Sequence, residues 1–271
     1  MAQITRKPNP QGDEPGRTVI TVGDGVAIPY RKDAGLFNAW RIAFIGAIAA
    51  VGYLALFRPD PYLKILKFVP DGILVTFEVT IEAILLALVI GLFTGLGRIS
   101  KNRIANGIAS LYVEVIRGIP LLVQLFYIYY ALGRVVNLPA TVSAVIAMAV
   151  CYGAYMGEIF RAGIESIPKG QMEAARSLGM THSQAMRHVI LPQAVKTILP
   201  PIGNEFVALL KDSSLVSILA VSDLLRRGRE FAAESFTYFE TYTMVALIYL
   251  IITLFLSKLI GIMEERIGAN D

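Results

Sequence analysis

The sequence predicts an all-α integral membrane protein, and three observations lead to this fold class. Hydrophobic residues make up 55% of the 271 residues and charged residues only 17%, against the usual quarter in soluble domains. The apolar residues are gathered in long blocks, a pattern typical of transmembrane helices. The charges fall mainly between these blocks. The composition therefore argues against a soluble enzyme, and a net charge of +4 is too small to indicate a nucleic-acid partner.

The first elements in order are a polar tail and a short apolar block. Residues 1–39 contain several prolines and a Gly23-Asp24-Gly25 turn but no sustained apolar period, which predicts a cytoplasmic polar tail. Residues 40–58 are predicted to form a short transmembrane helix. The flanking Arg41 and Arg58 can extend it by reaching toward the bilayer surfaces.

Five further apolar blocks are long enough to cross a bilayer and are predicted to be transmembrane helices. They occupy approximately residues 72–96, 111–132, 135–158, 195–221 and 241–263. The second of these blocks is interrupted at Arg117-Gly118-Ile119-Pro120, and the fourth by Pro200 and Pro201, so we expect breaks there.

The distribution of Lys and Arg predicts the orientation of these spans. Basic residues are more numerous in the segments on the same side as the amino terminus, so both termini are predicted to be cytoplasmic. The cluster Arg226-Arg227-Gly228-Arg229 lies on the opposite side and goes against this rule.

The polar segment 165–194 carries its own helix signals. Ser166 and Pro168 are suited to the start of a helix, and Gly179 is suited to a left-handed cap at its end. Thr181 and Gln184 have the spacing of a capping box, which predicts a second short helix ending before Pro192.

This helix pair has two interpretations. Ala174 and Ala175 would let another surface approach closely, while Leu178 and Met180 offer apolar anchors, which favours docking of a cytoplasmic partner. The same features also suit a connector that packs on the ends of the spans of this chain.

Several motifs together resemble one family. The stretch Glu173-Ala174-Ala175-Arg176-Ser177-Leu178-Gly179, followed by Ile190-Leu191-Pro192-Gln193-Ala194, resembles the EAA loop of ABC importer permeases, in the polar amino acid branch. The similarity continues in order over about residues 72–265, through residues 112–125, 154–164, 201–205 and 210–216.

The resemblance implies a fold and a set of partners. It implies a core of five transmembrane helices over 72–265 with two short coupling helices in 165–194, so that 1–39 and 40–58 are additions. The chain would form half of an amino acid path in the bacterial inner membrane. The implied partners are a dimer of ATP-binding subunits, a second permease subunit, identical or homologous, and an extracytoplasmic amino-acid-binding protein.

This chain has no G-x-x-x-x-G-K-[ST] loop, the motif that binds the phosphates of ATP. It is therefore predicted to be neither an enzyme nor a cofactor-binding chain, and ATP and Mg are expected on the ATP-binding subunits. By resemblance, the residues that contact those subunits are Glu173, Ala174, Ala175, Leu178, Gly179 and Met180.

Polar side chains within the apolar blocks are candidates for the substrate path, because each is costly in hydrocarbon and must face a partner, the protein interior or water. They are Glu78, Glu82, Asn204, Glu205, Lys211 and Asp212. Glu78 and Glu82 share one helix face, and Glu82 is the leading path candidate. Asn204, Lys211 and Asp212 are expected to lie near one another. The alternative role for these residues is pairing with one another, with Arg117 or across the subunit interface.

A third group is predicted to be structural or part of a gate: Glu114, Arg117, Pro120, Glu158 and Arg161. Arg117 is expected to satisfy a carbonyl freed by Pro120 or to pair with Glu114. His182 and His188 do not share a helix face, and Cys151 is the single cysteine, so no metal site is predicted.

Two other functions remain open from the residues alone. A secondary transporter or channel would need internal repeats, and a non-transporting scaffold would not explain the intramembrane polar residues. Within the family, basic, acidic and amide amino acids and opines are all possible substrates. Glu78 and Glu82 favour a cationic or zwitterionic one.

Overall fold

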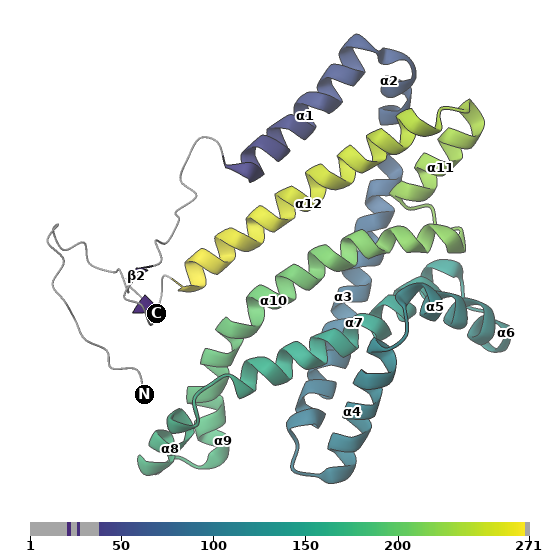
Figure 1. Cartoon of the computed structure of the whole chain (residues 1–271). Helices are drawn as coiled ribbons and strands as arrows, with labels where there is room; N and C mark the ends of the chain where they lie inside the picture. The colour runs from purple at the N-terminus through teal and green to yellow at the C-terminus, as the bar shows by residue number, and fades with distance from the viewer. Residues whose placement is uncertain (1–20, 23–25, 28–37, 269–271) are drawn as a thin grey trace, which may run out of the picture. The chain divides into compact units, whose positions relative to one another are not determined.

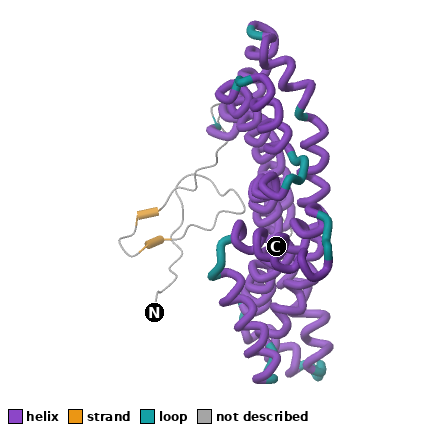
Figure 2. The backbone as a smooth tube through the Cα atoms, turned by 90° about the vertical axis from the view of Figure 1, so that its right-hand side faces the viewer, coloured by secondary structure: helices purple, strands orange, loops and turns teal. Residues whose placement is uncertain are grey.

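The computed structural model describes residues 21–22, 26–27 and 38–268, and the chain divides into two units, residues 1–39 and 40–271. In the first unit, strands β1 (Thr21–Val22) and β2 (Val26–Ala27) pair antiparallel (Figure 2). The rest of the predicted polar tail up to residue 37 lies outside the described residues. In the described part of the second unit all regular secondary structure is helical, which confirms the all-α fold class for the membrane portion.

The helices of the second unit are shown in Figure 1. They are α1 (Ala39–Phe57), α2 (Pro59–Phe68), α3 (Pro70–Ile99), α4 (Arg103–Arg117), α5 (Leu121–Phe126), the π-helix η1 (Tyr127–Leu132), α6 (Gly133–Val136), α7 (Ala140–Glu165), α8 (Lys169–Ser177), α9 (His182–Ala185), the π-helix η2 (Met186–Ile190), α10 (Leu191–Asp212), the 3₁₀-helix η3 (Ser213–Leu219), α11 (Leu224–Ser235) and α12 (Tyr238–Gly268).

Among the described residues, four helices are long and apolar enough to cross a membrane: α1, α3, α7 and α12. A fifth span is possible if the bent pair formed by α4 and the α5–η1 segment crosses as one unit. The remaining predicted span corresponds to α10 and η3. Helix α10 carries Lys196, Glu205, Lys211 and Asp212, and it is not among the helices that qualify by length and composition.

The predicted span 111–132 is not one straight helix. Helix α4 begins at Arg103, where the Asn102 side chain accepts the N–H groups of Ile104 and Ala105 and caps the helix. The chain then turns by 102° between α4 and the α5–η1 segment. The break after Arg117 was expected from Pro120, which takes the position before the first residue of α5.

The start of α10 and its course differ from the sequence expectations. Helix α9 does not end before Pro192 but continues through the π turn η2 into α10. Pro192 follows η2 directly, as the second residue of α10. Pro200 and Pro201 also lie inside an uninterrupted helix, so the expected break is wrong. Membrane helices tolerate proline when neighbouring groups compensate the freed carbonyls.

The core of the unit is the packing of α3 against α7. Gly91 and Gly95 on α3 face Gly153 and Gly157 on α7, and each pair is four residues apart, a spacing typical of closely packed membrane helices. A Cβ on Gly157 would lie 2.6 Å from Thr94 Cγ2, and one on Gly95 would lie 2.7 Å from Phe160 Cβ. The two backbones therefore approach as closely as glycine allows. Met148 and Met156 are fully buried in this core.

Helix α1 is mostly exposed, and it lies beside α12 in Figure 1. The Trp40 indole Nε1 donates a hydrogen bond to the Leu254 carbonyl of α12 at 2.9 Å. At the other end of the helix, Val51 and Leu54 pack against a second buried cluster that includes Tyr62 and Ile65 of α2. Helix α1, which lies outside the five-helix core implied by the family resemblance, is therefore attached to the periphery of the second unit.

Candidate functional site

The bend between α4 and α5 is held by one buried side chain. Gln124 Nε2 donates hydrogen bonds to the carbonyls of Ile116 and Ile119, each at 2.9 Å, and lies 3.7 Å from Cys151 Sγ on α7. Gln124, rather than Arg117, thus satisfies carbonyls left without helical partners at the bend. The prediction that Arg117 satisfies a carbonyl freed by Pro120 is therefore wrong, and Gln124 was not among the residues selected from the sequence.

Beside this bend lies a cavity of about 430 Å³ between the α4–α5 bend, α7 and the second half of α10. Its lining comes from three parts of the chain that are far apart in sequence: Arg117, Gly118, Ile119, Pro120, Leu121, Cys151, Tyr152, Tyr155, Glu205 and Asp212. We refer to it as the polar pocket.

The polar pocket combines one cation with two carboxylates. The Arg117 guanidinium lies 5.1 Å from the centre of the Tyr155 ring, a cation–π contact, and this replaces the expected pair with Glu114. The Asp212 carboxylate accepts a hydrogen bond from the Tyr152 hydroxyl at 2.8 Å. Glu205 lies seven residues before Asp212 on α10, two helical turns away on the same face. The pocket thus presents charges of both signs to a small polar molecule.

The structure separates the six predicted path residues. Glu205 and Asp212 line the polar pocket. Glu78 and Glu82 share a face of α3, as expected, but that face is exposed on this chain and does not reach the pocket. Asn204 and Lys211 are exposed on α10, seven residues apart and so on one face, and they do not line the pocket. Neighbouring residues on a helix differ by about 100° in direction, which turns Lys211 away from Asp212.

The predicted gate residues also separate. Arg117 and Pro120 line the polar pocket, while Glu114 is exposed on α4. Glu158 and Arg161, near the carboxyl end of α7, belong to a chain of ion pairs. Glu158 binds both Arg161 and Arg98 of α3, and Arg161 also binds Glu165.

These contacts join the ends of α3 and α7 next to the start of α8. The sequence analysis missed Arg98, Tyr152 and Tyr155. For the two tyrosines a signal was present, because they are three residues apart and so share a helix face.

The loop between α7 and α10 forms the predicted helix pair. Helix α8 ends in a Schellman motif, in which Met180 N–H donates to the Ala175 carbonyl at 3.2 Å and Gly179 N–H to the Arg176 carbonyl at 3.0 Å. Gly179 has φ +87°, which confirms the predicted left-handed cap. Thr181 and Gln184 form the predicted capping box at the start of α9. Ser166 does not cap α8; its hydroxyl donates to the Gly163 carbonyl, and Pro168 takes the cap position.

The side chains of this loop face two directions. Leu178 is 82% exposed, while Glu173, Ala174 and Gly179 are also on the surface and Met180 is half-buried. Ala175 is buried, so the small face expected from Ala174 and Ala175 together is divided. Ala175 packs within the chain, and Ala174 remains available. Leu178 thus presents an apolar side chain at the surface, directly before the left-handed turn at Gly179.

Comparisons with known proteins match most of the chain to membrane transport proteins. Residues 87–269 match the family of binding-protein-dependent transport system inner membrane components. The chain is 42% identical to an L-cystine transport system permease protein of Bacillus subtilis, over 72% of this chain and 85% of that protein. It is 39% identical to a glutamine transport system permease protein of Escherichia coli, over 72% of this chain and 91% of that protein.

A solved structure described as an amino acid ABC transporter with histidines superposes with a TM-score of 0.72 at 44% identity, covering 75% of this chain and 96% of that one. The matched region includes the α3–α7 core from residue 87 onward, the polar pocket and the α8–α9 loop. The chain therefore belongs to the family of binding-protein-dependent transport system inner membrane components and is a permease of the ABC importer type.

Proposed function

We propose that this permease imports polar amino acids and that the polar pocket receives the amino acid during its passage. The observation that carries the proposal is that Arg117, Glu205 and Asp212 line one and the same cavity. Every free α-amino acid carries a carboxylate and an ammonium group. Arg117 is suited to the carboxylate, and Glu205 and Asp212 are suited to the ammonium.

The size and lining of the polar pocket support this proposal. A volume of about 430 Å³ lies within the range of about 300 to 1,000 Å³ common for small-molecule sites. Tyr152 and Tyr155 add apolar ring faces for the substrate side chain. The relatives named for glutamine and cystine transport, and the solved transporter with histidines, handle different side chains on the same amino acid backbone. Recognition of the ammonium and carboxylate groups that these amino acids share would accommodate such different side chains.

The energy for import would come from separate ATP-binding subunits, which would also hold ATP and Mg. Helix α8 and the exposed Leu178 are the proposed contact with those subunits. Closure of the ATP-binding subunits would move this contact and bias the permease toward one of two states. A second permease subunit and an extracytoplasmic binding protein complete the proposed assembly. The α8–α9 loop would then face the cytoplasm, and both termini are proposed to lie on that side.

The exposed carboxylates of α3 fit this assembly. Glu78 and Glu82 face away from the rest of this chain, and carboxylates are costly in contact with lipid. We propose that the second permease subunit or the water-filled path covers this face. Glu82 therefore remains a candidate for the path between the two subunits.

Reconstitution tests the proposal. The permease is placed in proteoliposomes with its ATP-binding subunit and binding protein, and uptake of labelled amino acids is measured with and without internal ATP. We expect ATP-dependent uptake that falls at least about tenfold in Asp212→Asn, because a charge-assisted contact to the ammonium is lost.

A matched control removes a carboxylate far from the polar pocket. Asp60 is exposed and pairs only with Lys64 in the described part of the chain, so Asp60→Asn should transport as the unmodified protein does. Uptake driven by an ion gradient without ATP would contradict the proposed energy source. Equal uptake by Asp212→Asn and Asp60→Asn would contradict the proposed role of the polar pocket.

A further inference from the structure

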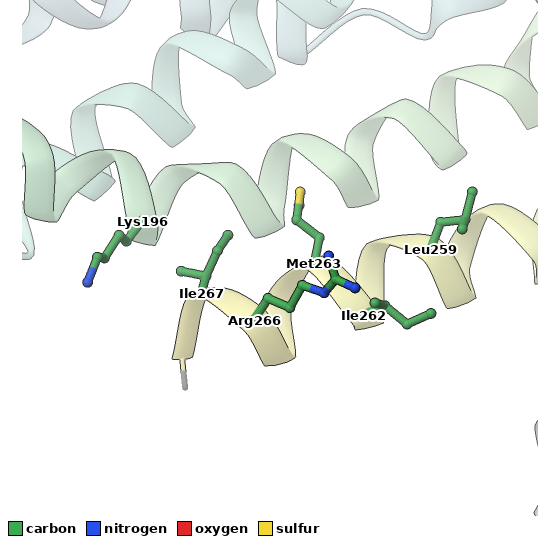
Figure 3. A pocket seen from close by; sticks show the side chains of 6 residues that line it. All are labelled: Lys196, Leu259, Ile262, Met263, Arg266 and Ile267. Atoms are coloured by element: carbon green, nitrogen blue, oxygen red, sulfur yellow. The ribbon is translucent and has the colours of Figure 1, made fainter. Parts of the chain in front are cut away.

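The cation of the polar pocket differs from those of a further cavity, of about 420 Å³, between α10 and the carboxyl end of α12. That cavity is lined by Lys196, Leu259, Ile262, Met263, Arg266 and Ile267 (Figure 3), and both of its cations already have interaction partners. The side chain of Arg117, by contrast, is exposed, and no ion pair or hydrogen bond to it is found among the described residues. Its guanidinium contacts the face of the Tyr155 ring instead. Where Arg117 points therefore depends mainly on the backbone that carries it.

That backbone lies at the break between α4 and α5. Pro120 has no N–H, so the Ile116 carbonyl lacks the donor that the fourth following residue provides in a helix. The Ile119 N–H reaches the same carbonyl at 3.3 Å, which is long for a hydrogen bond. Arg117 lies within this segment, so its position needs a further group that binds the carbonyls at the break.

Gln124 supplies that group. Its amide nitrogen Nε2 carries two hydrogens and donates to the carbonyls of Ile116 and Ile119, each at 2.9 Å. Arg117 and Gly118 are the two residues between these carbonyls, so one amide holds the chain on both sides of them. Gln124 is only 6% exposed, and solvent water therefore has little access to replace its amide.

The Gln124 amide is itself attached to the core. The next residue, Leu125, is fully buried in the cluster that contains Met148 and Cys151 of α7. Gln124 Nε2 also lies 3.7 Å from Cys151 Sγ, and Cys151 lines the polar pocket. Gln124 thus links the backbone at Arg117 to α7, the helix that forms another wall of the pocket.

We propose that Gln124 is a positioning residue of the polar pocket. By binding the carbonyls on either side of Arg117 and Gly118, its amide directs the Arg117 guanidinium into the pocket, where it meets the carboxylate of the amino acid. The role rests on the proposed function, in which Arg117 binds that carboxylate. Without the amide, the backbone at Arg117 could adopt several directions, and the guanidinium would reach the carboxylate in only some of them.

Substrate binding by the assembled transporter tests this role. The permease is purified with its second permease subunit and the ATP-binding subunits but without the binding protein. Binding of labelled L-glutamine and L-histidine is measured by scintillation proximity, in competition with the α-amide of each, which lacks the carboxylate. The unmodified complex should prefer the free amino acid to its α-amide. We expect Gln124→Met to lower the affinity for the free amino acid on the order of tenfold and to leave that for the α-amide nearly unchanged, because a charge-assisted contact is weakened.

Gln124→Met is suited to this test because it should fold. Methionine is similar in size to glutamine, and Gln124 Oε1 is buried without a hydrogen-bond partner in the part of the chain that the structure describes. The exchange therefore also removes an unpaired buried acceptor. Unchanged binding of the α-amide reports an intact pocket. Gln124→Glu is a second variant, since a carboxyl group has at most one hydrogen to donate and cannot hold both carbonyls, and it should also lose preference for the free amino acid.

A double variant shows whether Gln124 acts through Arg117. Arg117→Gln alone should lose the preference for the free amino acid. If Gln124 only positions Arg117, the double variant Arg117→Gln, Gln124→Met should lose no more than Arg117→Gln does. Asn106→Leu is the matched control. The Asn106 amide also donates to a carbonyl eight residues away, that of Arg98, but Asn106 does not line the polar pocket, so the preference should remain.

Four outcomes would overturn the positioning role. The first is an unchanged preference in Gln124→Met. The second is an equal loss of affinity for the free amino acid and its α-amide, as expected if the variant only disturbs packing. The third is a double variant whose loss is the sum of the two single losses. The fourth is a loss of preference in Asn106→Leu as large as that in Gln124→Met.

The same measurements separate this role from the proposed function. If the unmodified complex binds neither amino acid, or if Arg117→Gln keeps the preference for the free amino acid, the proposed function of the polar pocket is wrong and the positioning role falls with it. A loss of preference in Arg117→Gln without a loss in Gln124→Met contradicts the positioning role alone.

Discussion

At the scale of a single residue, Gly179 determines the shape of the α8–α9 loop, the proposed contact with the ATP-binding subunits. Its φ of +87° is a conformation that residues with a Cβ rarely adopt, while no atom lies within 4 Å of the position a Cβ would take. Strain in Gly179→Ala therefore comes from the backbone alone, about 1–2 kcal/mol. We expect reduced uptake and reduced substrate-stimulated ATP hydrolysis in proteoliposomes, with normal membrane insertion.

Gly170 supplies the control for this prediction. It lies inside helix α8, which Gly179 follows, also with no atom within 4 Å of an added Cβ, but its φ is not positive. Gly170→Ala should transport normally, because alanine is favoured over glycine inside a helix. If both variants transport equally well, the left-handed turn is not needed for coupling.

Asp223 provides a pH-dependent effect at the same scale. It is fully buried at the start of α11, where it accepts the N–H groups of Leu225 and Arg226 at 3.2 and 2.9 Å. Burial raises the pKa of this carboxyl from 3.8 to about 6. Because the folded state holds the proton more tightly than the unfolded state, this residue favours folding at low pH. Its favourable contribution is lost as the pH rises from about 4 to about 6.

The comparison of the unmodified protein with Asp223→Asn isolates this effect. Asparagine can still cap α11 but does not ionise. We expect the stability of the unmodified protein relative to Asp223→Asn to fall by on the order of 2–3 kcal/mol between pH 4 and pH 7. Thermal melting of the detergent-purified permease across this range measures it. A difference that stays constant with pH would show that the buried carboxyl does not titrate there.

At the scale of elements, the contact between α3 and α7 is the most sensitive to added volume. Gly157→Ala places a methyl group 2.6 Å from Thr94 Cγ2, so the two helices must separate or Thr94 must move. We expect a loss of stability of about 1–3 kcal/mol, typical of overpacked cores. Gly46→Ala on α1 meets no atom within 4 Å and should melt no lower than the unmodified protein, because alanine is favoured over glycine inside a helix. Equal melting temperatures for both variants would contradict the tight α3–α7 packing.

The elements also show what the sequence could and could not predict. Helices α1, α3, α7 and α12 follow from apolar length, because the bilayer requires it. The capping box at Thr181 and the turn at Gly179 follow from local chemistry. The course of α10 through Pro200 and Pro201 could not be predicted, because local propensity gives no account of the groups that compensate a missing N–H.

Part of the polar pocket could be predicted from the sequence. Glu205 and Asp212 are seven residues apart and hence on one face of any helix that contains them, whereas Asn204 and Lys211 are not on that face. The partners that complete the pocket come from other helices. The stacking of Arg117 on Tyr155 depends on how the α4–α5 bend meets α7, and the spacing of residues along the chain carries no such information.

At the scale of the whole molecule, exposed apolar side chains and exposed charged side chains indicate where different molecules contact the chain. Apolar side chains of α1 such as Ile45 and Leu56 are 64% and 78% exposed, as expected of a helix that faces lipid. The face of α3 with Glu78 and Glu82 is exposed as well but charged, which lipid does not favour. The exposed apolar side chains of α1 thus suit contact with lipid, whereas the charged face of α3 suits contact with a protein or with water.

The continuity of α9, η2 and α10 has a mechanical consequence. Helix α10 has 22 residues and is about 33 Å long, at about 1.5 Å per residue. Its first residues adjoin the α8–α9 loop, and its last turns hold Glu205 and Asp212. If α10 tilts as a whole by about 5° about one end, its other end moves by about 3 Å. That displacement is as large as a hydrogen-bond length, and it is enough to make or break the contacts that we propose for the ammonium group of an amino acid.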